Sequence, residues 1–84
     1  MHNVYLEGRS AADLRQLPKD VLVRAITKIR SLGRNPRPPG CRKITGSRDY
    51  WRIRIGDYRV IYEIDDGNNR VNVMRVKHRR EVYG

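Results

Sequence analysis

The sequence predicts a small α+β domain in the order β-α-α-β-β-β, an antiparallel sheet with two helices packed on one face. Two observations predict this fold. Before the proline-rich segment at residues 35–40, apolar residues recur with the period of a helix; after it, they alternate with polar residues as in strands. The length of 84 residues is typical of one domain, which we expect to span residues 1–84.

The first predicted elements are a short strand and a short helix. Residues 2–6 are predicted to form a strand, with Val4 and Leu6 on one face. Ser10 followed by Asp13 has the spacing of a capping box, in which each residue satisfies a free backbone N–H of the other. This motif predicts a helix over residues 11–16.

A second, longer helix follows directly. Pro18 is typical of the first position of a helix, and Gly33 suits the position after its end, so the helix is predicted to run to Leu32. Its apolar residues fall on one stripe that should face the core. They are Leu22, Ala25, Ile26, Ile29 and Leu32.

The second half is rich in Ile, Val, Tyr and Trp, as strands are. Gly56-Asp57 predicts a two-residue hairpin turn, and residues 65–69 (DDGNN) predict a longer turn. The result is an antiparallel meander with strands at residues 50–55, 58–64 and 71–76, and 41–45 as a candidate short strand.

The two-residue turn sets the register of the hairpin. With Gly56 and Asp57 as the loop, Arg54 lies opposite Arg59, and Arg52 shares their face, because residues alternate between the two faces of a strand. Like charges directly opposite each other destabilise a sheet. Three guanidinium groups gathered in this way are suited to binding phosphate, and the alternative is a solvated face whose arginines spread apart.

The net charge of +10 and the pI near 10.7 point to polyanionic partners such as nucleic acid, a ribosome, an acidic protein or an anionic membrane surface. The cations are 15 arginines and 4 lysines, a bias that favours bidentate phosphate recognition.

Composition excludes several classes of protein. The single cysteine, Cys41, cannot form an internal disulfide, and with two distant histidines it makes no structural zinc site. No apolar run is long enough to span a membrane, and the N-terminus lacks the features of a secretory signal. We therefore expect a cytoplasmic protein with no membrane partner and no metal or other cofactor.

The segment at residues 78–84 (HRREVYG) is the second concentration of reactive side chains. It offers an acid, a phosphate clamp and a stacking ring, or else it is a frayed basic terminus. Elsewhere, Cys41 is expected to fill space, Asp65 and Asp66 to form a turn, and Tyr5 and Trp51 to lie in the core.

Two stretches, YWRIRIGDYRVIYEI at residues 50–64 and KHRREVY at residues 77–83, resemble the RelE/ParE toxin superfamily, specifically RelE-like toxins of bacterial type II toxin–antitoxin pairs. The resemblance covers nearly the whole chain. It implies a ribosome-dependent endoribonuclease that cleaves mRNA in the A site. In this metal-independent reaction the ribose 2′-OH attacks the adjacent phosphate.

Positions matched to the family give the expected site. The resemblance implies that the catalytic residues are Arg52, Arg54, Arg59, Arg79 and Tyr83. Further RNA contacts are expected from Arg42, Lys43, Arg48, His78 and Arg80.

One departure leaves the general base open. Some members carry a lysine at the position of Arg52, but arginine effectively cannot lose a proton, so His78, Tyr83 or the ribosome would handle protons. The resemblance also implies an acidic, RelB-like antitoxin whose complex with the toxin binds operator DNA through the antitoxin.

Two other functions stay open at this point. A ParE-like toxin would inhibit DNA gyrase without catalysis, although it would not need converging arginines. A plain nucleic-acid-binding module is disfavoured, since the chain shows no helix-turn-helix reading helix and no interleaved surface aromatics.

Overall fold

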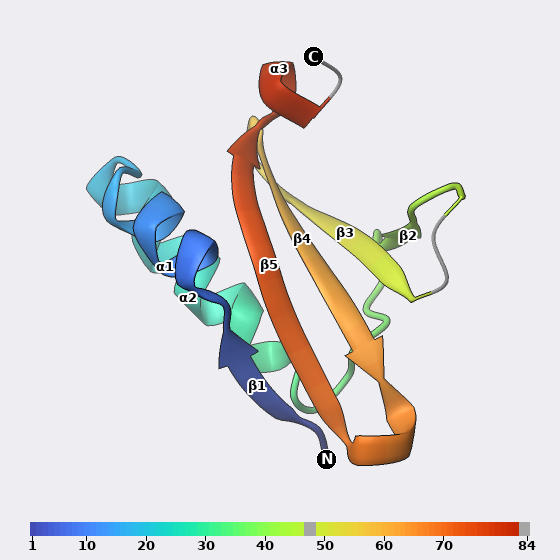
Figure 1. The fold of residues 1–84 in the computed structure, drawn as a ribbon. Coiled ribbons are helices and arrows are strands. Elements are labelled where there is room, and N and C mark those ends of the chain that lie inside the picture. Colours follow the sequence, from blue (N-terminus) through green and yellow to red (C-terminus); the bar gives the residue numbers. More distant parts are fainter. Residues whose placement is uncertain (47–48, 83–84) are drawn as a thin grey trace.

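The computed structural model describes residues 1–46 and 49–82, and all their side chains except those of residues 81 and 82. The elements, drawn in Figure 1, are β1 (Asn3–Leu6), α1 (Gly8–Arg15), α2 (Lys19–Ser31), β2 (Arg42–Lys43), β3 (Tyr50–Ile55), β4 (Tyr58–Asp65), a 3₁₀ turn (Asp66–Asn68), β5 (Arg70–His78) and α3 (Arg79–Val82). The predicted order of two helices and a following meander is confirmed, and the single turn α3 is additional.

The strands form one five-stranded sheet in the order β1-β5-β4-β3-β2. Strands β3, β4 and β5 are the predicted antiparallel meander, and β2 joins it in antiparallel orientation. Strand β1 pairs with β5 in parallel, with Val4 opposite Val71, so the sheet is mixed where the sequence predicted an antiparallel one. In Figure 1 both long helices lie to the left of β5.

The core lies between the helices and one face of the sheet. Its buried members are Leu14, Ala25, Ile29, Leu32, Ile53, Ile55, Val60, Tyr62, Ile64, Val71, Val73 and Val76. Two expectations about the core are wrong: Ile26 is 37% exposed and Tyr5 is 43% exposed. Tyr5 instead packs under Arg70, whose guanidinium carbon lies 4.3 Å from the ring centre.

The start of α1 differs from the prediction. The helix begins at Gly8, and Ser10 lies within it, where its hydroxyl donates to the carbonyl of Glu7 at 2.7 Å. Asp13 forms no capping box. Its carboxylate accepts hydrogen bonds from Arg75 Nε at 2.8 Å and from the backbone N–H of Val76 at 2.9 Å.

Asp13 thereby extends the edge of the sheet. The ladder between β1 and β5 ends at Leu6 and Val73, and the Asp13 carboxylate takes the N–H that β5 presents beyond it. Burial raises the pKa of Asp13, but the hydrogen bonds from Arg75 and Val76 together lower it by more. The pKa therefore lies below its ordinary value of 3.8.

Gly33 follows the end of α2 as predicted, but the reason is close packing. Its carbonyl accepts a hydrogen bond from the N–H of His2 at 2.8 Å, which joins the helix end to the start of β1. A Cβ at Gly33 would lie 2.9 Å from the carbonyl oxygen of His2, too close for any other residue. At the other end of α2, Pro18 occupies the N-cap and not the first helical position.

None of the helices formed by residues 1–46 and 49–82 is long and apolar enough to cross a membrane.

Candidate functional site

The hairpin of β3 and β4 has the register predicted from its two-residue turn. Arg54 pairs with Arg59, and Arg52 pairs with Ile61. The alternating residues Ile53 and Ile55 are buried on the helix side. The three arginines therefore share the opposite face of the sheet, as expected.

These arginines line a hollow of about 180 Å³ on that face. We call it the arginine hollow; it is formed by Gly40, Arg42, Arg52, Arg54 and Arg59. Arg42 joins it because β2 places this residue directly opposite Arg52. The predicted RNA contact at Arg42 thus lies beside the predicted catalytic arginines.

Arg59 is the most unusual residue in the hollow, because its side chain is buried. Only 7% of Arg59 is exposed, and its Nε and Nη1 atoms are buried without a hydrogen-bond partner among the described residues. A buried guanidinium normally forms an ion pair or is fully hydrogen-bonded. Its cross-strand neighbours are instead two further cations, Arg54 and Lys77. This arrangement is suited to an anion that enters the hollow.

Sequence reasoning missed Lys77. It lies on β5 directly opposite Arg59 and is half-buried. The register of β5 could not be read from the sequence, because the turn before it is long and the pairing of β4 and β5 shifts between Ile61 and Tyr62. The available signal was the alternation of charge in residues 75–79, where every second residue is Arg or Lys.

Arg79 lies at the same end of the sheet as the hairpin turn, at the start of α3. Its backbone N–H donates to the carbonyl of Asp57 at 2.7 Å, and its Nε is 3.9 Å from a carboxylate oxygen of the same residue. The side chain is exposed and is not among the residues that line the arginine hollow. The neighbouring Arg80 is also exposed.

His78 and Lys43 lie on the other face of the sheet. His78 pairs with Tyr58, and the two rings meet edge to face with centroids 5.2 Å apart. Its Nδ1 accepts the backbone N–H of Arg80 at 3.3 Å. Lys43 is opposite Trp51, a residue that packs against the core. The structure therefore does not bring these two predicted RNA contacts to the arginine hollow. The predicted site residues Arg48 and Tyr83 lie outside the described residues.

Several other side chains that the sequence singled out have structural roles. Trp51 is half-buried against the core as expected, with the Arg37 guanidinium carbon 5.1 Å from its ring centre. Asp66 forms ion pairs with His2 and Arg37, each at 2.9 Å. Over residues 1–46 and 49–82, His, Cys, Asp and Glu side chains make no group of three or more able to hold a metal ion.

The buried Tyr62 ties the loop after α2 to the sheet. Its hydroxyl donates to the carbonyl of Pro36 at 2.6 Å, and burial raises its pKa far above the ordinary value of 10. Cys41 packs beside it at the edge of the core, in agreement with the expected space-filling role.

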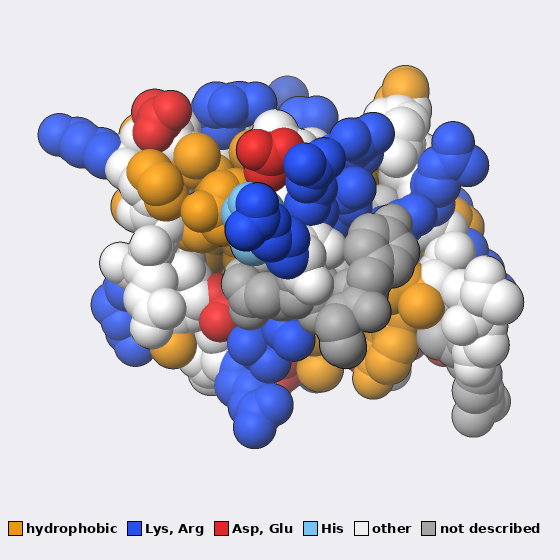
Figure 2. Space-filling model, turned by 90° about the horizontal axis from the view of Figure 1, so that it is seen from above, with side chains coloured by type: hydrophobic (Ala, Val, Ile, Leu, Met, Phe, Trp, Pro, Cys, Tyr) orange, Lys and Arg blue, Asp and Glu red, His pale blue; other side chains and the backbone are white. Residues whose placement is uncertain are grey.

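Figure 2 views the molecule from above, onto the end of the sheet that carries α3. Lys and Arg side chains surround this end and acidic side chains are few, in keeping with the net charge of +10.

Residues 4–83 match the family model described as the ParE toxin of type II toxin–antitoxin systems.

The chain belongs to the RelE/ParE toxin superfamily.

Relatives within the superfamily agree with the RelE-like resemblance. The toxin RelE of Mycobacterium tuberculosis is 30% identical over 83 residues, which cover 98% of this chain and 86% of that protein. The RelE–RelB complex of Pyrococcus horikoshii OT3 superposes with a TM-score of 0.82 at 28% identity, over 93% of this chain and 94% of that one. The isolated E. coli RelE toxin gives a TM-score of 0.82 at 25% identity, over 99% and 92% of the two chains. The chain is thus a RelE-like toxin of a type II toxin–antitoxin system.

Proposed function

We propose that this toxin is an endoribonuclease that enters the ribosomal A site and cleaves mRNA there. The ribose 2′-OH attacks the adjacent phosphorus, the bond from phosphorus to the 5′ oxygen of the next nucleotide breaks, and the products are a 2′,3′-cyclic phosphate and a free 5′-OH. The 2′-OH loses a proton and the leaving 5′ oxygen gains one, so the reaction needs no metal ion or cofactor to balance.

The buried guanidinium of Arg59, whose Nε and Nη1 have no hydrogen-bond partner among the described residues, is the observation that carries the proposal. The attacked phosphate gains negative charge in the transition state, and fixed cations in a site with little water stabilise that charge strongly. Arg59 is held at the base of the arginine hollow before any ligand arrives, with Arg54 and Lys77 on either side of it. A phosphate in the hollow would pair with the charge of the Arg59 guanidinium and relieve the repulsion among the three cations.

Proton transfer needs a different kind of residue, because an arginine effectively cannot release its proton. The resemblance to the family favours Tyr83 for this task. The structure adds Lys77 as a second candidate, since a lysine beside the phosphate can exchange a proton as well as supply charge. His78 is less suited, because its ring packs against Tyr58 on the far face of the sheet.

The proposed partners are the ribosome with its mRNA, and an acidic, RelB-like antitoxin. A free domain with a charge of +10 attracts acidic segments, and the similar toxin of Pyrococcus horikoshii was solved in complex with RelB. The complex of toxin and antitoxin would bind operator DNA through the antitoxin.

A second candidate target is DNA gyrase, because the matching family model is that of the ParE toxin. The converging arginines favour RNA cleavage, since a toxin that only binds has no need of a preformed phosphate site.

Mapping of mRNA 5′ ends by primer extension after induction of the toxin separates the two targets. RNA cleavage gives new ends inside translated codons, and Arg59→Met abolishes them. Intact mRNA together with DNA breaks and induction of the SOS response would refute the ribonuclease proposal and support gyrase.

A further inference from the structure

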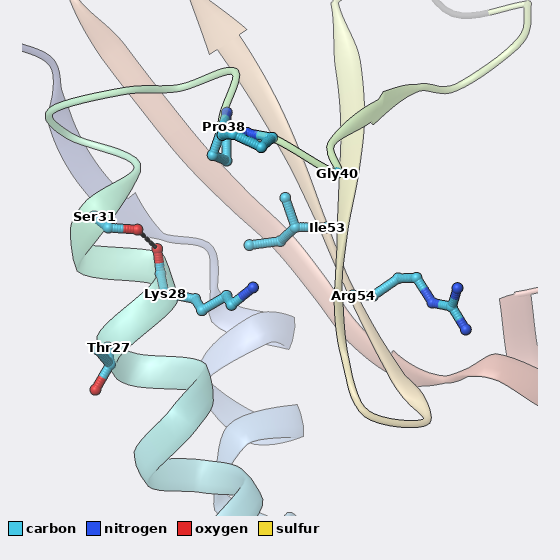
Figure 3. A pocket seen from close by; sticks show the side chains of 8 residues that line it. Thr27, Lys28, Ser31, Pro38, Gly40, Ile53 and Arg54 are labelled. Carbon is cyan, nitrogen blue, oxygen red and sulfur yellow. Dashed lines mark hydrogen bonds between the residues drawn. The ribbon is translucent and has the colours of Figure 1, made fainter.

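A groove lies beside the arginine hollow, between α2 and the proline-rich loop. We call it the α2 groove; it has a volume of about 370 Å³ and is lined by Thr27, Lys28, Ser31, Pro38, Pro39, Gly40, Ile53 and Arg54. In Figure 3 the Lys28 side chain runs from α2 toward Ile53, whereas the Arg54 side chain points away to the other side of β3. The groove and the hollow thus lie on opposite sides of β3.

Gly40 and Arg54 line both sites, so the two meet at the edge of β3. Among the described residues, β2 pairs with β3 only through Arg42 with Arg52 and Lys43 with Trp51. The edge of β3 after Arg52 is therefore not paired with β2. Gly40 has φ +90° and open space around the position of a Cβ. An extended chain can therefore pass over Gly40 from the hollow into the groove without meeting a side chain there.

The groove offers the groups that a nucleotide needs. Lys28 supplies a cation for phosphate, and Pro38 and Pro39 supply an apolar wall for a base or a ribose. The hydroxyl proton of Ser31 is committed to the carbonyl of Lys28 at 2.6 Å, whereas the Thr27 hydroxyl points away from the groove in Figure 3. The Ser31 oxygen retains a lone pair that can accept from a ribose 2′-OH, the group that distinguishes RNA from DNA.

We propose that the α2 groove is a second RNA subsite, which takes a nucleotide adjoining the one held in the arginine hollow, on the same strand. The inference rests on the proposed function, because it presumes that the hollow binds an RNA phosphate. Lys28 binds the phosphate of the adjoining nucleotide, and the strand crosses β3 over Gly40.

The test measures binding of fluorescein-labelled RNA by anisotropy, with a single nucleotide, which fills one site only, and with an unstructured oligonucleotide of about nine nucleotides. The proposed cleavage requires the ribosome, so unmodified RNA stays intact in these measurements. Lys28→Gln removes the charge and keeps helix propensity, and Lys19→Gln is the matched control, since it makes the same charge change in the first turn of the same helix. Arg59→Met tests the hollow itself.

Lys28→Gln should weaken binding of the longer RNA by about three- to tenfold and reduce its salt slope by about 0.7, the value for one phosphate contact on a single strand. Binding of the single nucleotide by Lys28→Gln, and both affinities of Lys19→Gln, should match the wild type. Equal losses of RNA affinity in the two lysine variants would overturn the subsite. An affinity loss in Lys28→Gln that is the same for the short and the long RNA would also overturn it. If Lys28→Gln weakened binding to the ribosome but not to the longer RNA, the subsite would also be overturned, because Lys28 would then contact RNA of the ribosome. Single-nucleotide binding that survives Arg59→Met instead refutes the proposed function, which is a separate outcome.

Discussion

Replacing Arg59 with Met should stabilise the fold and abolish the activity. Methionine fills a similar volume, so the change removes the charge and the unpartnered Nε and Nη1 without leaving a large cavity. Buried donors that lack partners destabilise a protein by about 1–3 kcal/mol. Because Arg59 also lies between Arg54 and Lys77, its replacement relieves repulsion. We therefore expect the free energy of unfolding to rise by about 1–3 kcal/mol.

Thermal unfolding measures this effect, since 1 kcal/mol shifts the Tm of a domain of this size by about 4–8 °C. The control is Arg54→Met, at an exposed position on the same face, which should change stability by at most about 0.5 kcal/mol. The same Arg59→Met protein should cleave translated mRNA about 10²–10³-fold more slowly, as expected for loss of one preorganised charge-stabilising group.

Binding of an anion should show whether Arg59 belongs to a ligand site or only supports the fold. A trinucleotide RNA that binds in the arginine hollow should raise the Tm of the wild-type protein as its concentration exceeds Kd, and it should leave that of Arg59→Met unchanged. A lower Tm for Arg59→Met than for the wild type would show that Arg59 supports the fold, and it would refute the assignment of the hollow as a phosphate site.

Three further predictions concern single residues. Lys77→Arg keeps the charge beside Arg59 but replaces an ammonium group that can release a proton with a guanidinium that effectively cannot. Near-normal single-turnover cleavage would assign Lys77 to charge stabilisation, and a loss of about 10²–10⁴-fold would assign it to proton transfer. Tyr83→Phe should slow cleavage by the same factor if the hydroxyl is the acid; a silent Phe with a severe Ala variant would mean that the ring only stacks. Asp13→Asn should destabilise the fold by about 1–3 kcal/mol at pH 7, because a carboxylate whose pKa is lowered in the folded state contributes its full stability above the ordinary value of 3.8. In urea unfolding this difference should shrink as the pH falls below 3.8 and vanish below the lowered pKa of the folded state; a constant difference would contradict the account.

The predictable part of the site is the part held by local geometry. The two-residue turn aligns β3 with β4, and alternation then places Arg52, Arg54 and Arg59 on one face without any knowledge of the helices. Lys77 was out of reach because its position depends on a shift in pairing between β4 and β5. The burial of Arg59 was also out of reach, since it depends on the surrounding long side chains and not on strand period.

Non-local contacts explain the errors in the fold. Asp13 matches a capping box in sequence, but β5 competes for its carboxylate with a guanidinium and a backbone N–H. The parallel pairing of β1 with β5 has no local signature, because it joins residues nearly seventy positions apart. Tyr5 is exposed because it alternates with Val4, which packs against the core, so Tyr5 lies on the face of the sheet away from the helices. Ile26 belongs to the apolar stripe of α2 and is nevertheless 37% exposed.

Alternation along β3 and β4 separates stability from function residue by residue. Ile53, Ile55 and Val60 face the helices and fill the core, while the arginines between them face the hollow. Changes on the helix side should therefore unfold the domain, whereas changes on the arginine side should leave it folded and inactive. Arg59 is the informative exception, because it is as buried as the core and still belongs to the site. A residue whose removal is expected to strengthen the fold points to a role in binding, and the proposed RNA phosphate would account for both its charge and its burial.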